Sequence, residues 1–563
     1  MRGGGGGDVM RERAACDGMK RAGGDGMKRA GGDVMRGGGG EGMRGAGHGI
    51  IAAIAALLAL PGHAADAPPP DAPAPLFVDR SAGLPGPHVY DGGWTHFVGG
   101  GVAAFDCDAD GFPDLFAAGG DAPARLMRNA TPAHGAPLAF EDVSTRLPAP
   151  LTGVTGAYPL DIDGDGELDL AVLRVGPNLL LRGTGGCHFA PAPPEWGFAS
   201  PDRWTAAFSA TWRAGDALPT LAFGNYVDRT DPEGPFEACD ASALYLPGAA
   251  RYRAPVNLSP GHCALSMLFS DWRRDGRVDL RVSNDRHYYV LKGAEQMWRL
   301  TDPPRLLGPE DGWDRVSIWG MGIASQDLNG DGLPEVMLTS MGDQLLRFAT
   351  AAPGFRDAPY ALGTTAHRPH AGGDGRPSTG WHAAFGDVDN DGRADIFIAK
   401  GNVDQMPGNA MRDPNSLLMQ APDGRFVERS VEAGVASMAR SRGAALVDLN
   451  LDGRLDLAVV NRRAPMELWE NATPDAGHWL AVDLSQPGAN RRAAGAWVEV
   501  RTPGGRIEAR EVTVGGGHAS GAAVPVHFGL GEAMGAEVRV IWPGGEVGEW
   551  APLAAGEIHR IAR

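Results

Sequence analysis

The feature that most constrains this chain is a nine-residue acidic motif that recurs at a nearly constant interval. Its form is Asp-x-Asp/Asn-x-Asp-Gly-x-x-Asp/Glu, followed by a short apolar run. Full copies occupy residues 106–114, 161–169, 327–335, 387–395 and 448–456. A weaker copy at 271–279 carries Arg273 in place of the second acid, and a copy near 212–220 has lost the acid pattern. We number these loops one to seven in chain order. Their starts lie 51 to 61 residues apart, which indicates a β-propeller or a solenoid.

The short apolar runs around each loop favour a propeller over a solenoid. An apolar strand precedes each loop, as in 102–105 and 444–447, and another follows it, as in 168–173 and 396–399. A third and a fourth short run then close the unit. Four strands per unit with little helical periodicity are typical of a propeller blade.

The two ends of the repeat region predict that the ring closes on itself. The seventh unit ends near residue 469 without a fourth strand, whereas 76–84 (LFVDRSAGL) matches the fourth run of the sixth unit. An N-terminal strand that completes the last blade would remove the exposed sheet edges. The predicted fold class is therefore all-β: a seven-bladed propeller over 76–474, followed by a small β-sandwich-like domain over 477–563.

The acidic loops predict calcium sites. Acids at positions 1, 3, 5 and 9 surround one point, Gly at position 6 permits the tight turn, and the position-7 carbonyl can face inward. Such hard oxygen ligands suit Ca²⁺, and without a cation the carboxylates would repel one another, so we expect metal binding to be coupled to folding. We expect about five sites. Their candidate ligands are Asp106, Asp108, Asp110, Phe112 and Asp114; Asp161, Asp163, Asp165, Glu167 and Asp169; Asp327, Asn329, Asp331, Leu333 and Glu335; Asp387, Asp389, Asp391, Arg393 and Asp395; and Asp448, Asn450, Asp452, Arg454 and Asp456.

An EF-hand does not explain these loops. It needs a bidentate Glu at position 12 and flanking helices. Position 12 is Ala117, Val172, Leu338, Ile398 or Val459 here, and the flanks look like strands. In the fourth loop we expect Arg273 to take the place of the cation.

The N-terminus predicts export. Residues 1–42 are a Gly-rich low-complexity extension, either flexible or placed upstream of the true start at Met43. Residues 43–64 have the charged, apolar and small-residue regions of a signal peptide cleaved after Ala64, and 65–75 is an Ala/Pro linker. We therefore expect a periplasmic or extracellular protein without membrane insertion after cleavage.

Charge and cysteine content narrow the possibilities further. The net charge of -18 argues against nucleic-acid binding, which requires a cationic surface. Four cysteines follow the signal peptide, which permits two disulfides in three pairings or free thiols. Cys239 and Cys263 are close in sequence and are the expected pair.

The repeats resemble the FG-GAP/VCBS repeats of integrin α-subunit propellers and of many bacterial secreted proteins. Residues 478–550 are similar to the ASPIC/UnbV domain, whose recurring elements are 490–491 (NR), 495–496 (GA), 527–531 (HFGLG) and 542–545 (WPGG). Repeats followed by that domain resemble the cartilage acidic protein family. The resemblance implies calcium binding and export, and it departs from the pattern at the third and fourth units.

The expected function is that of a calcium-stabilised binding or adhesion module for an extracellular glycan or protein. No nucleophile elbow, P-loop, HExxH or dinucleotide motif occurs in a convincing context, and the runs 99–101 and 515–517 (both GGG) lack the helix that phosphate binding requires. We therefore name no catalytic residue. An exported carbohydrate lyase or hydrolase at the channel mouth is the alternative. Aromatic and hydrogen-bonding side chains suit sugars or peptides. The candidates at the mouth are Trp94, His96, Trp204, Trp319, Trp381, His382 and Arg442, with packing between blades as the other interpretation.

Overall fold

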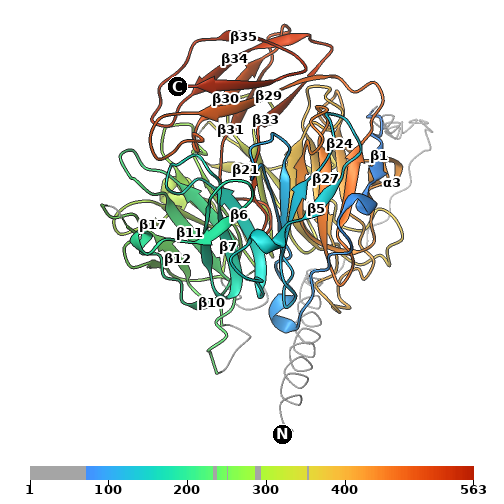
Figure 1. Cartoon of the computed structure of the whole chain (residues 1–563). Helices are drawn as coiled ribbons and strands as arrows, with labels where there is room; N and C mark the ends of the chain where they lie inside the picture. Colours follow the sequence, from blue (N-terminus) through green and yellow to red (C-terminus); the bar gives the residue numbers. More distant parts are fainter. Residues whose placement is uncertain (1–71, 233–237, 250, 286–292, 352–353) are drawn as a thin grey trace, which may run out of the picture.

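The computed structural model describes residues 72–232, 238–249, 251–285, 293–351 and 354–563 (Figure 1). The segments that the sequence predicts to be an N-terminal extension, a signal peptide and most of a linker lie outside these residues. Among the described residues, no helix is long and apolar enough to span a bilayer.

The repeat region forms seven four-stranded antiparallel blades, and the all-β prediction is confirmed. The first three blades are β2 (Val102–Phe105), β3 (Asp114–Ala117), β4 (Arg125–Asn129) and β5 (Phe140–Asp142); β6 (Val154–Leu160), β7 (Asp169–Pro177), β8 (Leu179–Gly183) and β9 (Phe189–Pro191); and β10 (Asp202–Thr211), β11 (Thr220–Asn225), β12 (Ser242–Tyr245) and β13 (Val256–Leu258). The next three are β14 (Ala264–Ser270), β15 (Asp279–Asn284), β16 (Gln296–Arg299) and β17 (Arg305–Leu306); β18 (Ile323–Gln326), β19 (Glu335–Leu338), β20 (Leu345–Ala349) and β21 (Phe355–Asp357); and β22 (Gly380–Gly386), β23 (Asp395–Lys400), β24 (Ser416–Gln420) and β25 (Phe426–Glu428). The seventh is β26 (Arg440–Val447), β27 (Asp456–Arg462), β28 (Glu467–Asn471) and β1 (Phe77–Asp79).

The ring closes as the sequence predicts. β1 pairs antiparallel with β28, with Phe77 opposite Asn471 and Asp79 opposite Trp469. Arg80 adds an ion pair to Glu470, with 3.0 Å between Nε and Oε2. A seam made from both ends of the repeat region excludes an open solenoid.

Neighbouring blades pack their apolar faces against one another, so the strands nearest the axis are buried on both sides. All four residues of β2 and all seven of β6 are buried. One core cluster joins the first, second and seventh blades, through side chains such as Phe105, Leu170 and Leu468. The two disulfides are Cys239–Cys263, the expected pair, and Cys107–Cys187, which links the first loop to the second blade.

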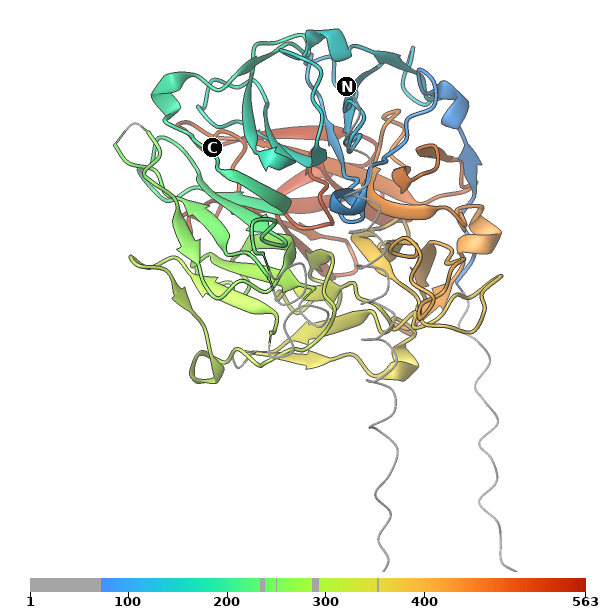
Figure 2. The same ribbon diagram turned by 90° about the horizontal axis from the view of Figure 1, so that it is seen from below.

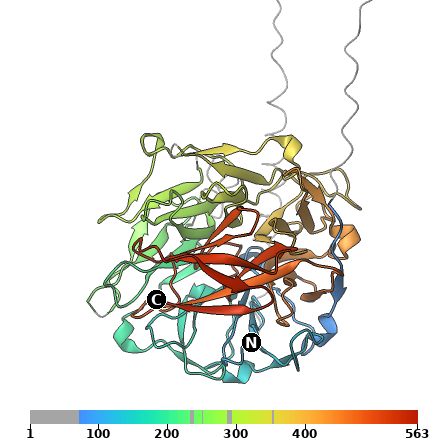
Figure 3. The same cartoon turned by 90° about the horizontal axis from the view of Figure 1, so that it is seen from above.

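The C-terminal domain consists of two small sheets around one core. One sheet holds β33 (Val526–Gly531), β29 (His478–Ser485) and β36 (Ile558–Ala562), and the other holds β31 (Ile507–Glu511), β30 (Trp497–Arg501), β34 (Gly535–Ile541) and β35 (Ala551–Ala554). The core between them includes Leu480, Val498 and Phe528. Seen from above, this domain lies across the centre of the ring (Figure 3).

A segment of the C-terminal domain fills the propeller axis. Residues 513–523, which we call the central finger, enter the ring between β31 and β33 and include β32 (Ala522–Ala523), which pairs with β2. From below, strands of the C-terminal domain are visible at the centre of the ring (Figure 2). The finger contacts all seven blades through bridges, hydrogen bonds and close backbone approaches, at Ala104, Ala157, Ala210, Leu268, Ile323, His382 and Gly443. The propeller therefore has a filled axis and not an open channel.

Candidate functional site

The five acidic loops and the fourth share one turn. The carboxylate at position 1 accepts a hydrogen bond from the backbone N–H of the position-6 glycine, at 2.8 Å for Asp106, 3.0 Å for Asp161 and 2.7 Å for Asp387. The fourth, fifth and seventh loops repeat this bond. The glycines need the left-handed region, with φ of 96° at Gly111 and 86° at Gly453.

The acid at position 9 ties the loop to its own blade. Asp114 accepts hydrogen bonds from the N–H of Cys107 at position 2 and from the N–H of Asn129 at the end of the third strand, both at 2.7 Å. Asp169, Asp395 and Asp456 repeat this pair of bonds. Sequence reasoning treated position 9 only as a metal ligand, but it also holds the turn together.

In three loops the acids at positions 1, 3 and 9 converge on one point. The groups are Asp106, Asp108 and Asp114; Asp161, Asp163 and Asp169; and Asp387, Asp389 and Asp395, with ligand oxygens within 4.8 Å of one another. In the fifth and seventh loops position 3 is Asn329 or Asn450. Among the described residues, Oδ1 of Asp106 and Oδ1 of Asp108 are buried without a hydrogen-bond partner. Buried oxygens that lack a donor fit a bound cation.

Burial raises the pKa of the carboxyl groups at positions 1 and 9, and the neighbouring acids raise it further. The pKa of Asp114 and of Asp169 rises to about 8, and that of Asp448 to about 7, mainly because the groups are desolvated. Burial raises the pKa of Asp387 and Asp395 well above the usual range. An ionised cluster in such surroundings needs a positive countercharge.

Arginines supply part of that charge, and sequence reasoning missed them. Arg128 reaches Asp108 at 2.5 Å and Asp110 at 3.2 Å from the third strand of the first blade. Arg182 binds Asp163 and Asp165 in the same way, at 2.8 and 2.7 Å. In the sixth and seventh loops the position-7 arginine itself pairs with the position-5 acid. The sequence carries a signal for these two ion pairs, because Arg is the next-to-last residue of the third strand in both blades.

The fourth loop makes a contact between domains that the sequence did not predict. Arg273 donates to the carbonyl oxygen of Asp311 at 2.7 Å and lies 4.3 Å from the centre of the Trp272 ring. Its neighbour Arg274 instead reaches Glu499 of the C-terminal domain at 2.8 Å. This loop is therefore a contact between domains. The hydrogen bond from Arg277 and, to a smaller extent, the charge of Arg273 lower the pKa of Asp275 in the loop, so the replacement of a cation by Arg273 stays a prediction.

The candidate residues at the channel mouth come together, but most of them are core residues. The rings of Trp94 and Trp204 lie 5.0 Å apart, in one cluster with Trp319 and Trp381. His96 and His382 are buried, and Trp204, Trp381 and Arg442 are fully buried. Only Trp94 and Trp319 of the seven are partly exposed.

Arg442 shows why these side chains are buried. Its guanidinium lies 4.0 Å from the centre of the Trp381 ring and donates to the carbonyl oxygens of Phe97, Asn402 and Val403. His382 accepts a hydrogen bond from the N–H of His518 in the central finger, at 3.1 Å. The structure thus favours packing between blades, and not ligand contact, for Trp204, Trp381, His382 and Arg442.

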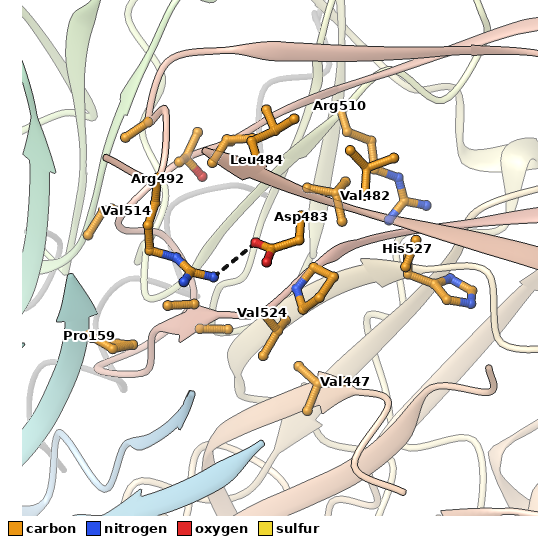
Figure 4. A pocket seen from close by; sticks show the side chains of 18 of the residues that line it. Pro159, Val447, Val482, Asp483, Leu484, Arg492, Arg510, Val514, Val524 and His527 are labelled. Atoms are coloured by element: carbon orange, nitrogen blue, oxygen red, sulfur yellow. Dashed lines mark hydrogen bonds and ion pairs between the residues drawn. The ribbon is translucent and has the colours of Figure 1, made fainter. Parts of the chain in front are cut away.

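A cavity of about 310 Å³ lies between the C-terminal domain and the propeller (Figure 4). Apolar side chains such as Val447, Val482 and Val524 line it, together with an Asp483–Arg492 pair at 3.4 Å. Sequence reasoning missed this cavity because its walls come from two domains whose relative placement no local pattern specifies.

Comparisons with known proteins agree with this architecture. Residues 106–172 and 327–398 match the model for FG-GAP-like repeats, and residues 486–563 match the model for ASPIC and UnbV. The chain is thus a β-propeller in which two stretches match FG-GAP-like repeats, followed by a C-terminal domain that matches ASPIC and UnbV, in agreement with the resemblance seen in the sequence.

More particular likenesses are weaker. The chain is 24% identical over 236 residues to cartilage acidic protein 1 of Mus musculus, which covers 40% of this chain and 34% of that protein, so the match spans about a third of the relative's length. A crystal structure of BBS1N in complex with ARL6DN aligns with 72% of this chain and 99% of that one, at 11% identity and a TM-score of 0.41. A lectin from Agrocybe aegerita aligns with 65% and 93%, at 12% identity and a TM-score of 0.37.

Proposed function

We propose that this chain is an exported calcium-binding propeller that serves as a binding or adhesion module for an extracellular or periplasmic glycan or protein. The observation that carries the calcium assignment is the convergence of three carboxylates in each of three loops, with ligand oxygens within 4.8 Å. Buried acids of one sign at that distance are stable together only with a countercharge.

The residues present fit calcium better than a softer metal. The donors in each loop are carboxylates, with an Asn amide in two loops, and hard oxygen donors of this kind suit Ca²⁺ or Mg²⁺. Bound calcium would supply positive charge that holds the loop's oxygens together. The chain itself contributes the turn. The N–H of the position-6 glycine and the two hydrogen bonds accepted by the position-9 acid orient the acids before a cation binds.

Calorimetric titration with calcium chloride tests this assignment. We expect Asp163→Ala in the second loop to lower the number of bound ions by about one, because alanine removes the ligand oxygen that Asn keeps at this position in the fifth and seventh loops. Asp216→Ala is the matched control, because Asp216 lies in the third unit and pairs with Arg213 at 3.3 Å. At free calcium about 100-fold above Kd, each site stabilises the fold by about 2.7 kcal/mol. No binding heat, together with a melting temperature that ignores chelator, would refute the assignment.

The ligand assignment rests on the partly exposed tryptophans at the mouth. Trp94 and Trp319 lie next to a rigid aromatic base, and such amphipathic rings suit sugar or peptide contacts. The protein can be incubated with a panel of polysaccharides and matrix proteins. We expect it to retain a ligand from the panel without releasing a product. Trp94→Ala should weaken retention, whereas Trp550→Ala on the C-terminal domain should not. Product release would instead show an enzyme. Retention that is unchanged in Trp94→Ala would contradict the assignment of the ligand site to the mouth.

A further inference from the structure

The face of the propeller that carries the carboxylate loops is the face on which the C-terminal domain sits (Figures 1 and 3). Arg491 donates to the carbonyl oxygen of Gly164 in the second loop at 3.4 Å. The N–H of Asp271 in the fourth loop donates to Glu511 at 2.8 Å. The metal loops are thus partly covered from within the same chain.

The closest cover is over the sixth loop. The N–H of Gly531 donates to the carbonyl oxygen of Asn390 at 2.7 Å, and the N–H of Gly477 donates to that of Asp389 at 2.9 Å. A Cβ at Gly529 would lie 1.9 Å from Oδ2 of Asp387, so only glycine permits this approach. Asp387 is 1% exposed.

The seventh loop is covered by the same strand. Nε2 of His527 donates to the carbonyl oxygen of Gly453 at 3.0 Å. A Cβ at Gly453 would lie 1.7 Å from Nε1 of Trp479, and the Trp479 ring stacks on His527. Residues 527–531 thus account for a recurring element of the C-terminal domain: they are its contact with two metal loops.

The first loop provides an internal contrast. Its carboxylates accept hydrogen bonds from the first blade itself: Asp108 and Asp110 accept from Arg128, and Asp114 accepts from the N–H groups of Cys107 and Asn129. Loss of a cation there would disturb one blade. Loss of a cation from the sixth loop would place uncompensated charge under the C-terminal domain.

We propose that cation binding in the sixth and seventh loops is coupled to docking of the C-terminal domain, so that the cation holds the domain and its central finger on the propeller. The inference rests on the calcium binding proposed above. The domain packs against the Asp387 carboxylate and the Asp389 backbone, and such desolvation disfavours the empty ionised cluster. A cation neutralises the cluster, so docking strengthens cation binding, and the cation strengthens docking by the same factor.

Hydrogen exchange in the full chain tests the coupling, with calcium chloride as the probe. Asp389→Ala and Asp108→Ala both remove a position-3 carboxylate from a three-acid group. Alanine is used because the fifth and seventh loops carry Asn at this position, so Asn would keep a ligand oxygen. In saturating calcium we expect Asp389→Ala to raise exchange of residues 513–523 by about tenfold, within the usual range of coupling between sites. Asp108→Ala should leave those residues protected. Equal protection of the finger in both variants would overturn the coupling.

A second variant changes the C-terminal domain side of the interface and covers the case in which Asp389→Ala does not fold. Gly529→Ala should weaken calcium binding at one or two sites by about tenfold. Gly504→Ala in the same domain is the control, since a Cβ there meets nothing within 4 Å. Calcium binding that Gly529→Ala leaves unchanged would overturn the coupling alone. Absence of calcium binding in the unaltered protein would overturn the proposed function and the coupling together.

Discussion

The central finger should make the propeller sensitive to acid through His518. Its side chain is fully buried, with Nδ1 donating to the carbonyl oxygen of Met321 at 3.2 Å and Nε2 accepting from the N–H of Gly99 at 3.1 Å. Burial, with smaller effects of Arg442 and His382, lowers the pKa of His518 to about 3. A proton on Nε2 would face the N–H of Gly99 and break that bond.

The magnitude follows from linkage. Unfolded histidine has a pKa of about 6.5, so the unfolded chain takes up a proton as the pH falls below that value and the native chain does not. Stability is therefore full above about pH 7 and is lost as the pH falls toward the native pKa. At pH 5 the loss from His518 is about 2 kcal/mol.

His518→Asn isolates this contribution. The amide can still donate to Met321, but it does not titrate. Urea unfolding in saturating calcium, followed by tryptophan fluorescence, measures both proteins at pH 7.5 and pH 5.0. We expect the variant to be less stable at pH 7.5 and the difference to shrink by about 2 kcal/mol at pH 5.0, because all other groups titrate in both proteins. A difference that changes by less than about 0.5 kcal/mol would refute the reasoning.

Three further changes test the architecture. Deletion of residues 76–84 removes the strand paired with β28 and should cause cooperative destabilisation and aggregation, seen by light scattering; a monomer with an unchanged melt would contradict ring closure. Replacement of Cys107 and Cys187 by Ser opens a link that spans 80 positions and should lower the free energy of unfolding by about 4–5 kcal/mol in denaturant titration, whereas an effect near zero would mean the bond does not constrain the unfolded chain. Gly101→Ala places a Cβ 1.8 Å from the carbonyl oxygen of Ala519 and should cost about 1–3 kcal/mol or more by thermal melt, with Gly408→Ala as the neutral control; equal effects would place the finger elsewhere.

Repetition made the propeller predictable. The spacing of the motifs predicted the number of blades, and the likeness between 76–84 and 426–435 predicted the closing strand. A pattern that recurs several times identifies strands that a single copy would leave ambiguous. The position-6 glycine was likewise expected from the turn, and the structure shows it at positive φ.

Features that depend on distant partners were not predictable. The run 515–517 is a glycine run without the helix that phosphate binding requires, and the sequence predicted no other role for it. In the structure its backbone contacts Leu268 and Ile323 on the axis. Trp204 and Trp381 have the composition of a ligand site, but their burial depends on neighbouring blades and on the finger. Arg128 and Arg182 pair with loop acids from another strand, which no motif within the loop records.

The fourth loop explains how the C-terminal domain can rest on an acidic face. Glu511 and Glu499 approach this loop from the domain. Burial, and to a smaller extent Asp271, raises the pKa of Glu511 to about 8, so further loop acids would make the charged form of Glu511 still less favourable. The loop instead carries Arg274, which pairs with Glu499 and lies 4.4 Å from the centre of the Trp497 ring. In the fourth loop an arginine thus supplies, at the contact with the C-terminal domain, the positive charge that we assign to a cation in the sixth loop.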